Sequence, residues 1–239
     1  MGNDKLPWVD HWPHLGNNID RNDFRYPGIG GLKHDLLDKR GKFIGKFHGI
    51  FQEFGSLDPN LLEKVVNIYA TSFYGSYLWD FSSNEANKLF NSWNSLLRLM
   101  YGVPNTTHRY LLESLSQYRH LKCDLYKRYL TFIHSLTNSR KVCLSTLGKR
   151  MVNDQGSVTA KNLLLIKNDS GCDNVLNMAP EAVSNLVQYA VVPPGEEWRS
   201  DFLLELLNLR KNNLELDFED DIQFTWDELN VLIREVATT

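Results

Sequence analysis

Cysteine is scarce in this chain of 239 residues, and the three that occur, Cys123, Cys143 and Cys172, form no close pair. An odd, dispersed set offers neither a disulfide framework nor a four-cysteine zinc site, so we expect reduced thiols, no metal and no other cofactor. Apolar runs of the roughly 20 residues that span a bilayer are also lacking. The residues before Pro13 carry charges where a signal peptide would be apolar. We therefore expect a folded intracellular protein with no membrane partner, in the nucleus or the cytoplasm.

Complete catalytic motifs are lacking as well. The sequence contains no His-Glu-x-x-His and no Gly-x-Ser-x-Gly. Phe218 to Asp221 has the aromatic-x-Asp-Asp form of a polymerase metal turn, but two-metal chemistry needs a further carboxylate from surrounding strands, and helical patterns precede this turn. We interpret it as an acidic surface loop and expect no enzyme activity.

Helical periodicity is the main signal that is present. Leu32 to Phe54 has one apolar stripe, Asp58-Pro59 is a helix start, and Ser83 can cap a helix that Gly102 ends. The pattern predicts further helices at residues 121–136, 142–152, 159–166, 181–189, 196–209 and 226–236. Trp8 to Asp20 reads as a short strand or hairpin. The predicted fold is all-α, a helical bundle with a short β-hairpin near the N-terminus.

Three regions follow from these patterns and from a change in charge. Residues 1–31 form the hairpin and a loop, residues 32–153 the main bundle, and residues 154–239 a helical tail module. From Arg98 to Arg150 ten Lys and Arg residues oppose two acids, whereas from Gly195 onward twelve acids oppose four basic residues. A basic middle followed by an acidic end predicts a surface that faces a polyanion.

Lysine and arginine on exposed helix faces bind nucleic-acid phosphates by releasing counterions. Tyrosines among them, at 110, 118 and 126, could stack on exposed bases, although helical spacing is also typical of core residues. The candidate phosphate contacts are Lys39, Lys42, Lys46, Arg98, Arg109, Lys122, Lys127 and Arg128.

The stretch Tyr69–Asp80, which reads Tyr-Ala-Thr-Ser-Phe-Tyr-Gly-Ser-Tyr-Leu-Trp-Asp, resembles a segment after the palm of LINE-type (non-LTR) retrotransposon reverse transcriptases. His14, Leu15 and Gly16 resemble the Leu-Gly signature of the primer-grip hairpin in that family. The same order continues in Trp93, Arg98-Leu99, Gly102-Val103-Pro104, Thr107-His108, Leu111-Leu112, Leu204–Arg210 and Phe224 to the end.

This resemblance implies that residues 32–153 form a thumb-like bundle after a primer-grip-like hairpin, without the palm and its catalytic aspartates. The implied function is noncatalytic, namely weak contact with the backbone of a primer-template or RNA duplex. The implied partner is therefore RNA or an RNA-DNA duplex. The resemblance also implies that apolar surface normally covered by the palm is exposed, so the chain could self-associate.

Two other interpretations stay open at the level of sequence. An all-α protein-interaction protein, or an inert relic, would use the acidic segment from Gly195 with exposed Trp198 and Trp226, and would bind no nucleic acid. An active polymerase would require a complete palm in the same chain, and the sequence contains no such region.

Overall fold

The structure is a computed structural model that describes residues 11–14, 17–20, 33–116, 118, 120–189, 195, 197–215 and 226–238. Two short strands, β1 (His11–His14) and β2 (Asn17–Asp20), pair antiparallel. The remaining described elements are helices, which confirms the mainly helical prediction. They are α2 (Lys33–Phe54), α3 (Pro59–Tyr69), the 3-10 helix η1 (Ser76–Leu78), α4 (Asn84–Tyr101), α5 (Arg109–Leu115), α6 (Leu121–Thr137), α7 (Val142–Asn153), α8 (Val158–Ser170), α9 (Pro180–Tyr189), α10 (Glu197–Glu215) and α11 (Trp226–Thr238).

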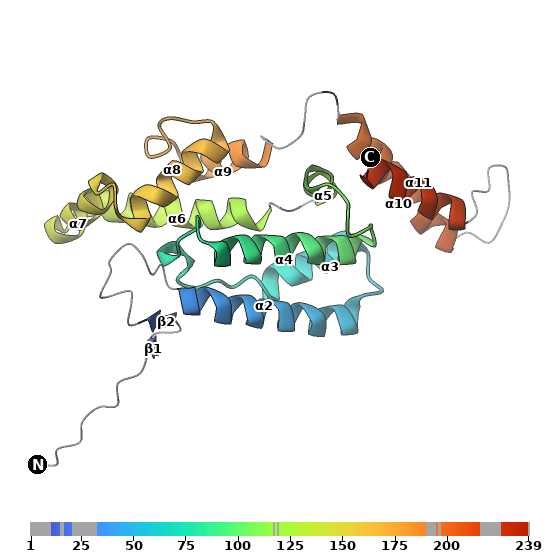
Figure 1. The fold of residues 1–239 in the computed structure, drawn as a ribbon, viewed down its shortest axis with the longest axis horizontal. Helices are drawn as coiled ribbons and strands as arrows, with labels where there is room; N and C mark the ends of the chain where they lie inside the picture. Colours follow the sequence, from blue (N-terminus) through green and yellow to red (C-terminus); the bar gives the residue numbers. More distant parts are fainter. Residues whose placement is uncertain are drawn as a thin grey trace, which may run out of the picture.

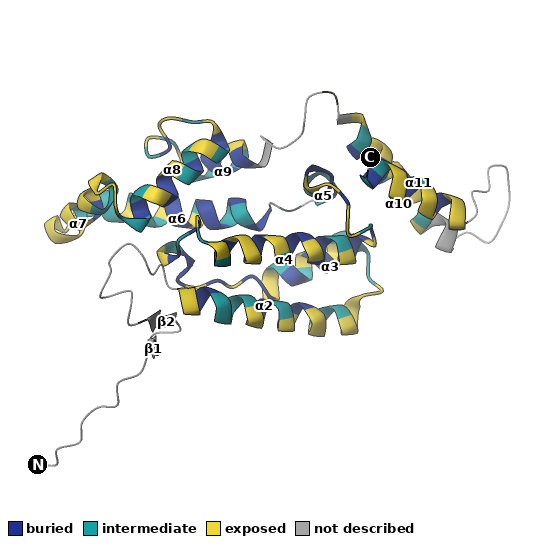
Figure 2. Ribbon diagram, in the orientation of Figure 1, coloured by how far each residue is buried: buried dark blue, intermediate teal, exposed yellow. Residues whose placement is uncertain are grey.

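The helices form an elongated body (Figure 1). Helix α2 packs on α3 and α4, α6 packs on α7, α9 and η1, and α10 and α11 form a hairpin that contacts α5. Helix α7 lies at one end of the body and the α10–α11 hairpin at the other (Figure 1). Inward faces are buried along α4 and α6, whereas α7 is exposed over most of its length (Figure 2).

Local capping explains why several helix ends were predictable. The Asp58 side chain accepts a hydrogen bond from the Asn60 backbone N–H at 3.0 Å, with Pro59 in the first turn. Ser83 accepts from Ala86 at 3.2 Å, and Gly102 ends α4 with φ of 60°. Two helices continue past their predicted ends at residues 166 and 209, since α8 extends to Ser170 and α10 to Glu215.

A single cluster of buried apolar residues runs through the helices and across the predicted boundary near Asn153, because Ile166 of α8 and Val183 of α9 belong to it. Its largest fully buried side chains include Trp79, Trp93 and Phe43. The rings of Phe43 and Trp93 lie 5.9 Å apart. Helices beyond residue 153 therefore complete the core of the bundle.

Hydrogen bonds hold the segment between η1 and α4 inside this core. The Trp79 indole donates to the buried carboxylate of Asp35 at 2.8 Å. The Asn162 amide of α8 donates to the Trp79 carbonyl at 2.7 Å and accepts from the Phe81 N–H at 2.9 Å. We call Asp35, Trp79, Phe81 and Asn162 the Trp79 joint, because they connect α2, α8 and the segment that leads into α4.

Candidate nucleic-acid interface

Five of the eight predicted phosphate contacts are partly buried or pair with a largely buried carboxylate. Arg98 donates to the Thr107 carbonyl at 2.6 Å, and burial lowers its pKa. The other four form ion pairs, and Lys122 is only 15% exposed. The pairs are Lys39 with Asp35 at 3.7 Å, Arg109 with Glu113 at 2.8 Å, Lys122 with Asp169 at 2.7 Å, and Lys127 with Glu181.

Lys42, Lys46 and Arg128, the other three predicted contacts, lie on the surface. The Lys42 ammonium lies 2.7 Å from the Asp38 carboxylate one turn earlier, and this hydrogen bond raises the pKa of Lys42. An exposed pair of this kind is weak, so Lys42 can exchange it for another anion. The structure therefore leaves these three charges in contact with solvent.

Three of the predicted cations meet at the end of α3 and the loop that follows it, Tyr69–Tyr74, which we call the 69–74 loop. Lys46 donates to the Tyr69 carbonyl at 3.3 Å, Arg128 donates to the Thr71 carbonyl at 3.3 Å, and Lys39 donates to the Tyr74 carbonyl. Helices α2 and α6 thus place positive charge on both sides of the loop. The sequence could not indicate this, because residues 39, 46 and 128 converge only in the fold.

Of the tyrosines that could stack on bases, Tyr110 and Tyr126 are instead core residues, the alternative that their helical spacing left open. Tyr126 is fully buried and donates to Asp169 at 2.6 Å, while Tyr110 is 9% exposed. Among the residues whose side chains the structure describes, the exposed tyrosines are Tyr69 and Tyr74, in the stretch that carries the family resemblance. Helical spacing identifies tyrosines on one face but does not identify which face turns inward.

Four further cations of the basic segment lie in α7 or just before it and were not among the predicted phosphate contacts. Arg140 and Lys141 precede the helix and Lys149 and Arg150 lie near its end, and all four are exposed. Within the described ranges, no hydrogen bond or ion pair engages their side chains. No acidic residue occurs between Leu125 and Asn153 that could neutralise them locally.

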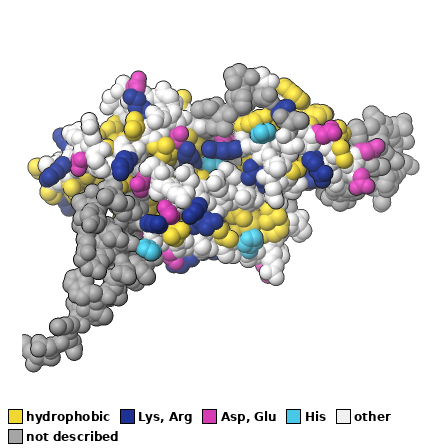
Figure 3. Space-filling view, viewed as in Figure 1, with side chains coloured by type: hydrophobic (Ala, Val, Ile, Leu, Met, Phe, Trp, Pro, Cys, Tyr) yellow, Lys and Arg dark blue, Asp and Glu magenta, His cyan; other side chains and the backbone are white. Residues whose placement is uncertain are grey.

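The packing of α7 explains this exposure. Gly148 is its buried residue, and a Cβ atom there would lie 3.0 Å from both the Leu136 side chain and the Thr137 backbone. Because α7 meets α6 at a glycine, the two backbones approach closely there. Most other residues of α7 are exposed. Figure 3 shows Lys and Arg side chains over this end of the molecule.

The primer-grip-like residues are described only in part. His14 ends β1 and pairs with Asn17 of β2, whereas Leu15 and Gly16 lie outside the described residues. Phe218 to Asp221, interpreted as an acidic loop, also lies outside them. The likeness of this hairpin to a primer grip rests on sequence alone.

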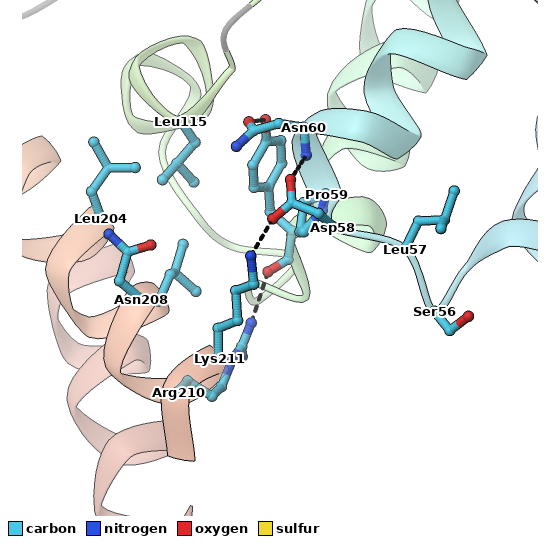
Figure 4. A pocket seen from close by; sticks show the side chains of 12 residues that line it. Ser56, Leu57, Asp58, Pro59, Asn60, Leu115, Leu204, Asn208, Arg210 and Lys211 are labelled. Atoms are coloured by element: carbon cyan, nitrogen blue, oxygen red, sulfur yellow. Dashed lines mark hydrogen bonds and ion pairs between the residues drawn. The ribbon is translucent and has the colours of Figure 1, made fainter. Parts of the chain in front are cut away.

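A cleft of about 510 Å³ separates α10 from the start of α3 and the end of α4 (Figure 4). Lys211 of α10 reaches the Asp58 carboxylate at 2.6 Å, and Arg210 donates to the carbonyls of Tyr101 and Gly102 at 2.8 and 2.9 Å. The Lys211 ammonium and the Asp58 carboxylate satisfy each other, and backbone carbonyls satisfy Arg210. The cleft is therefore the seam where α10 packs against the start of α3 and the end of α4. Its described lining places no nucleophile beside a general base.

Glu63 lies behind this seam with its side chain fully buried. Its carboxyl group accepts from the hydroxyls of Tyr101 at 2.8 Å and Ser116 at 2.5 Å. Burial raises the pKa of Glu63 more than these hydrogen bonds lower it. Above about pH 4.5 Glu63 ionises in the unfolded chain before it ionises in the folded protein. The free energy of unfolding therefore falls with rising pH until the pKa of Glu63 in the folded protein has been passed.

We expect Glu63→Gln to reduce this loss, because glutamine does not ionise. Between pH 4 and 7 wild type should lose more free energy of unfolding than the variant, by about 1.4 kcal/mol for each unit of pKa elevation. Urea unfolding at several pH values measures this difference. The exposed Glu53→Gln is the matched control, and parallel pH curves for wild type and Glu63→Gln would contradict the assignment.

Among the residues that the structure describes, no group of three or more His, Cys, Asp or Glu side chains is arranged to hold a metal ion. The described helices also include none with the length and apolar character needed to cross a bilayer. Comparison with known proteins yields no family, since no family model, no curated protein and no solved structure matches this chain.

Proposed function

We propose that this protein is a noncatalytic nucleic-acid-binding protein that contacts the phosphate backbone of RNA or an RNA-DNA duplex. The observation that carries the proposal is a set of four exposed cations in α7 or just before it, which have no counter-ion in the described part of the chain. They are Arg140, Lys141, Lys149 and Arg150. Cations already paired with carboxylates must exchange one partner for another. Unpaired cations gain the full benefit of counterion release.

The position of α7 also supports contact with a large polyanion. It lies at one end of the elongated body, away from the α10–α11 hairpin and its acidic residues, among them Asp227 and Glu228 (Figure 1). Exposed Lys42, Lys46 and Arg128 add charge on α2 and α6. Since none of these side chains is held in a pocket, we expect binding that is weak, insensitive to sequence and sensitive to salt.

The resemblance of Tyr69–Asp80 to LINE-type reverse transcriptases supports the same proposal and suggests its origin. On this proposal the chain is a remnant of such an enzyme in which α2 to α7 act as a thumb, and it functions inside the cell, where RNA is present. This origin rests on the sequence motif.

The test is titration of a labelled RNA-DNA duplex at 50 and 200 mM salt. We expect wild type to bind and to lose affinity steeply with salt. Lys149→Glu/Arg150→Glu should weaken binding at least tenfold at the lower salt and reduce the slope of log affinity against log salt by about 2. The helix should stay folded, because both side chains point to solvent.

Lys64→Glu/Lys88→Glu is the control, since it changes the net charge equally at exposed positions of α3 and α4. It should weaken binding less than threefold. Equal losses in both variants would mean that net charge alone drives binding and that α7 is not the interface. A folded protein that binds no duplex at either salt would remove the proposal.

A second candidate is a protein-interaction surface on α10. Trp198 is 57% exposed and Phe202 39% exposed, with their rings 6.5 Å apart. Adjacent exposed aromatic residues are typical of protein interfaces. Trp226, predicted for the same surface, begins α11, but its side chain lies outside the described residues. This candidate would be favoured by binding of a specific protein partner, which could be a second copy of the chain. That binding should persist at high salt and be lost in Trp198→Ala.

A further inference from the structure

The 69–74 loop presents two aromatic rings to solvent from a rigid support. Tyr69 is 65% exposed and Tyr74 61% exposed. Between them, the ring of buried Phe73 packs edge-on against Phe43 and Trp79, with centroids 5.6 Å away in both cases. The backbone that carries the tyrosines is thus anchored in the core, while both rings stay exposed. The Lys39 ammonium lies 5.9 Å from the centroid of the Tyr74 ring.

The cations beside the loop keep hydrogen-bond donors that no group in the described part of the chain uses. The Lys46 ammonium has three donors and gives one to the Tyr69 carbonyl, and the Arg128 guanidinium has five and gives one to the Thr71 carbonyl. Lys39 is less free, because its charge is shared with the buried Asp35. The loop therefore combines two exposed rings with two accessible cations.

We infer that the 69–74 loop binds unpaired nucleotides, with bases stacked on Tyr69 and Tyr74 and phosphates contacting Lys46 and Arg128. The inference rests on the proposed function and adds a ligand class to it, namely single-stranded RNA or DNA. Bases in a duplex already stack on one another and present no free face to a side chain. An exposed ring can stack only on a base that has left the helix.

This ligand suits the loop better than a duplex does for a second reason. Stacking tolerates any base, since every base has an aromatic face, and the flanking cations contact only phosphate. No arrangement of base-specific donors is needed, and the nearest cations are themselves held to backbone carbonyls. The loop should hold single strands of any sequence.

The experiment compares a labelled 20-nucleotide uridine RNA, the matching thymidine DNA and a blunt RNA-DNA duplex, all at 50 mM salt. Tyr69→Ala/Tyr74→Ala should weaken binding of both single strands at least tenfold and change binding of the duplex less than twofold. Tyr69→Phe/Tyr74→Phe should retain single-strand binding, because the rings remain. A loss for only one of the two single strands would show which sugar the loop requires.

Ile68→Ala is the control for removing an exposed apolar side chain next to the loop, since Ile68 is 60% exposed. It should leave all affinities unchanged. Unchanged single-strand binding in the double alanine variant, or equal losses for duplex and single strands, would overturn the inference. The proposed function would still stand in that case if the α7 variant lost duplex binding. Wild type that binds no nucleic acid would overturn both.

Discussion

Replacing Trp79 by alanine is expected to lower the free energy of unfolding by about 4 to 5 kcal/mol. Trp79 is fully buried, its ring contacts Phe73 with centroids 5.6 Å apart, and its indole N–H donates to buried Asp35 at 2.8 Å. The substitution leaves a large cavity and removes a hydrogen bond from a carboxylate. Since small domains are stable by about 5 to 15 kcal/mol, this loss could unfold the chain.

Two further variants separate the cavity from the hydrogen bond. Trp79→Phe keeps an aromatic ring and removes the donor, so we expect it to cost about 2 kcal/mol. Leu78→Ala, one residue earlier and 42% exposed, should cost about 0.5 kcal/mol or less. Chemical denaturation followed by circular dichroism measures all three. A cost for Trp79→Ala no larger than that for Leu78→Ala would contradict the burial of this ring.

Asn162→Leu is expected to cost about 3 kcal/mol. The Asn162 side chain is fully buried and bonds both the Trp79 carbonyl and the Phe81 N–H. Leucine has a similar volume but cannot satisfy either backbone group, and each buried group left unpaired costs about 1 to 3 kcal/mol. Because Asn162 lies in α8, this result would show that residues beyond Asn153 hold the N-terminal helices in place.

Asn168→Leu makes the same substitution at an exposed position of the same helix. It should change the free energy of unfolding by about 0.5 kcal/mol or less. If Asn162→Leu behaved like Asn168→Leu, the joint would contribute no stability. Residues 154–239 could then form a separate module, as the sequence predicted.

Most helices were predictable because their signals are local. Asp58 with Pro59, Ser83 and Gly102 act through neighbours two to four residues away, which a sequence displays directly. The ends of α8 and α10 were not predictable in this way. Helix α10 continues through Arg210 and Lys211, which bond the end of α4 and Asp58, and these partners are about a hundred residues or more distant in the chain.

The sequence predicted the candidate interface only as a segment with an excess of positive charge. The excess of basic residues from Arg98 to Arg150 is visible in the sequence, and it includes the four cations in α7 or just before it. Which cations remain unpaired depends on where the acids fold. Asp169 and Glu181 come from α8 and α9 to pair with Lys122 and Lys127, whereas no acid in the described chain reaches α7.

The sequence by itself determined the helical class, the helix starts and the basic character of the middle of the chain, since propensity, capping and charge act over a few residues. Only the tertiary structure decided that Asn162 bonds to Trp79 and that Tyr126 is buried while Tyr69 and Tyr74 are exposed. It also decided that the cations in α7 or just before it have no acidic partner in the described chain. Each of these outcomes depends on contacts between residues far apart in the chain. Burial and ion pairing arise from packing that no local pattern specifies.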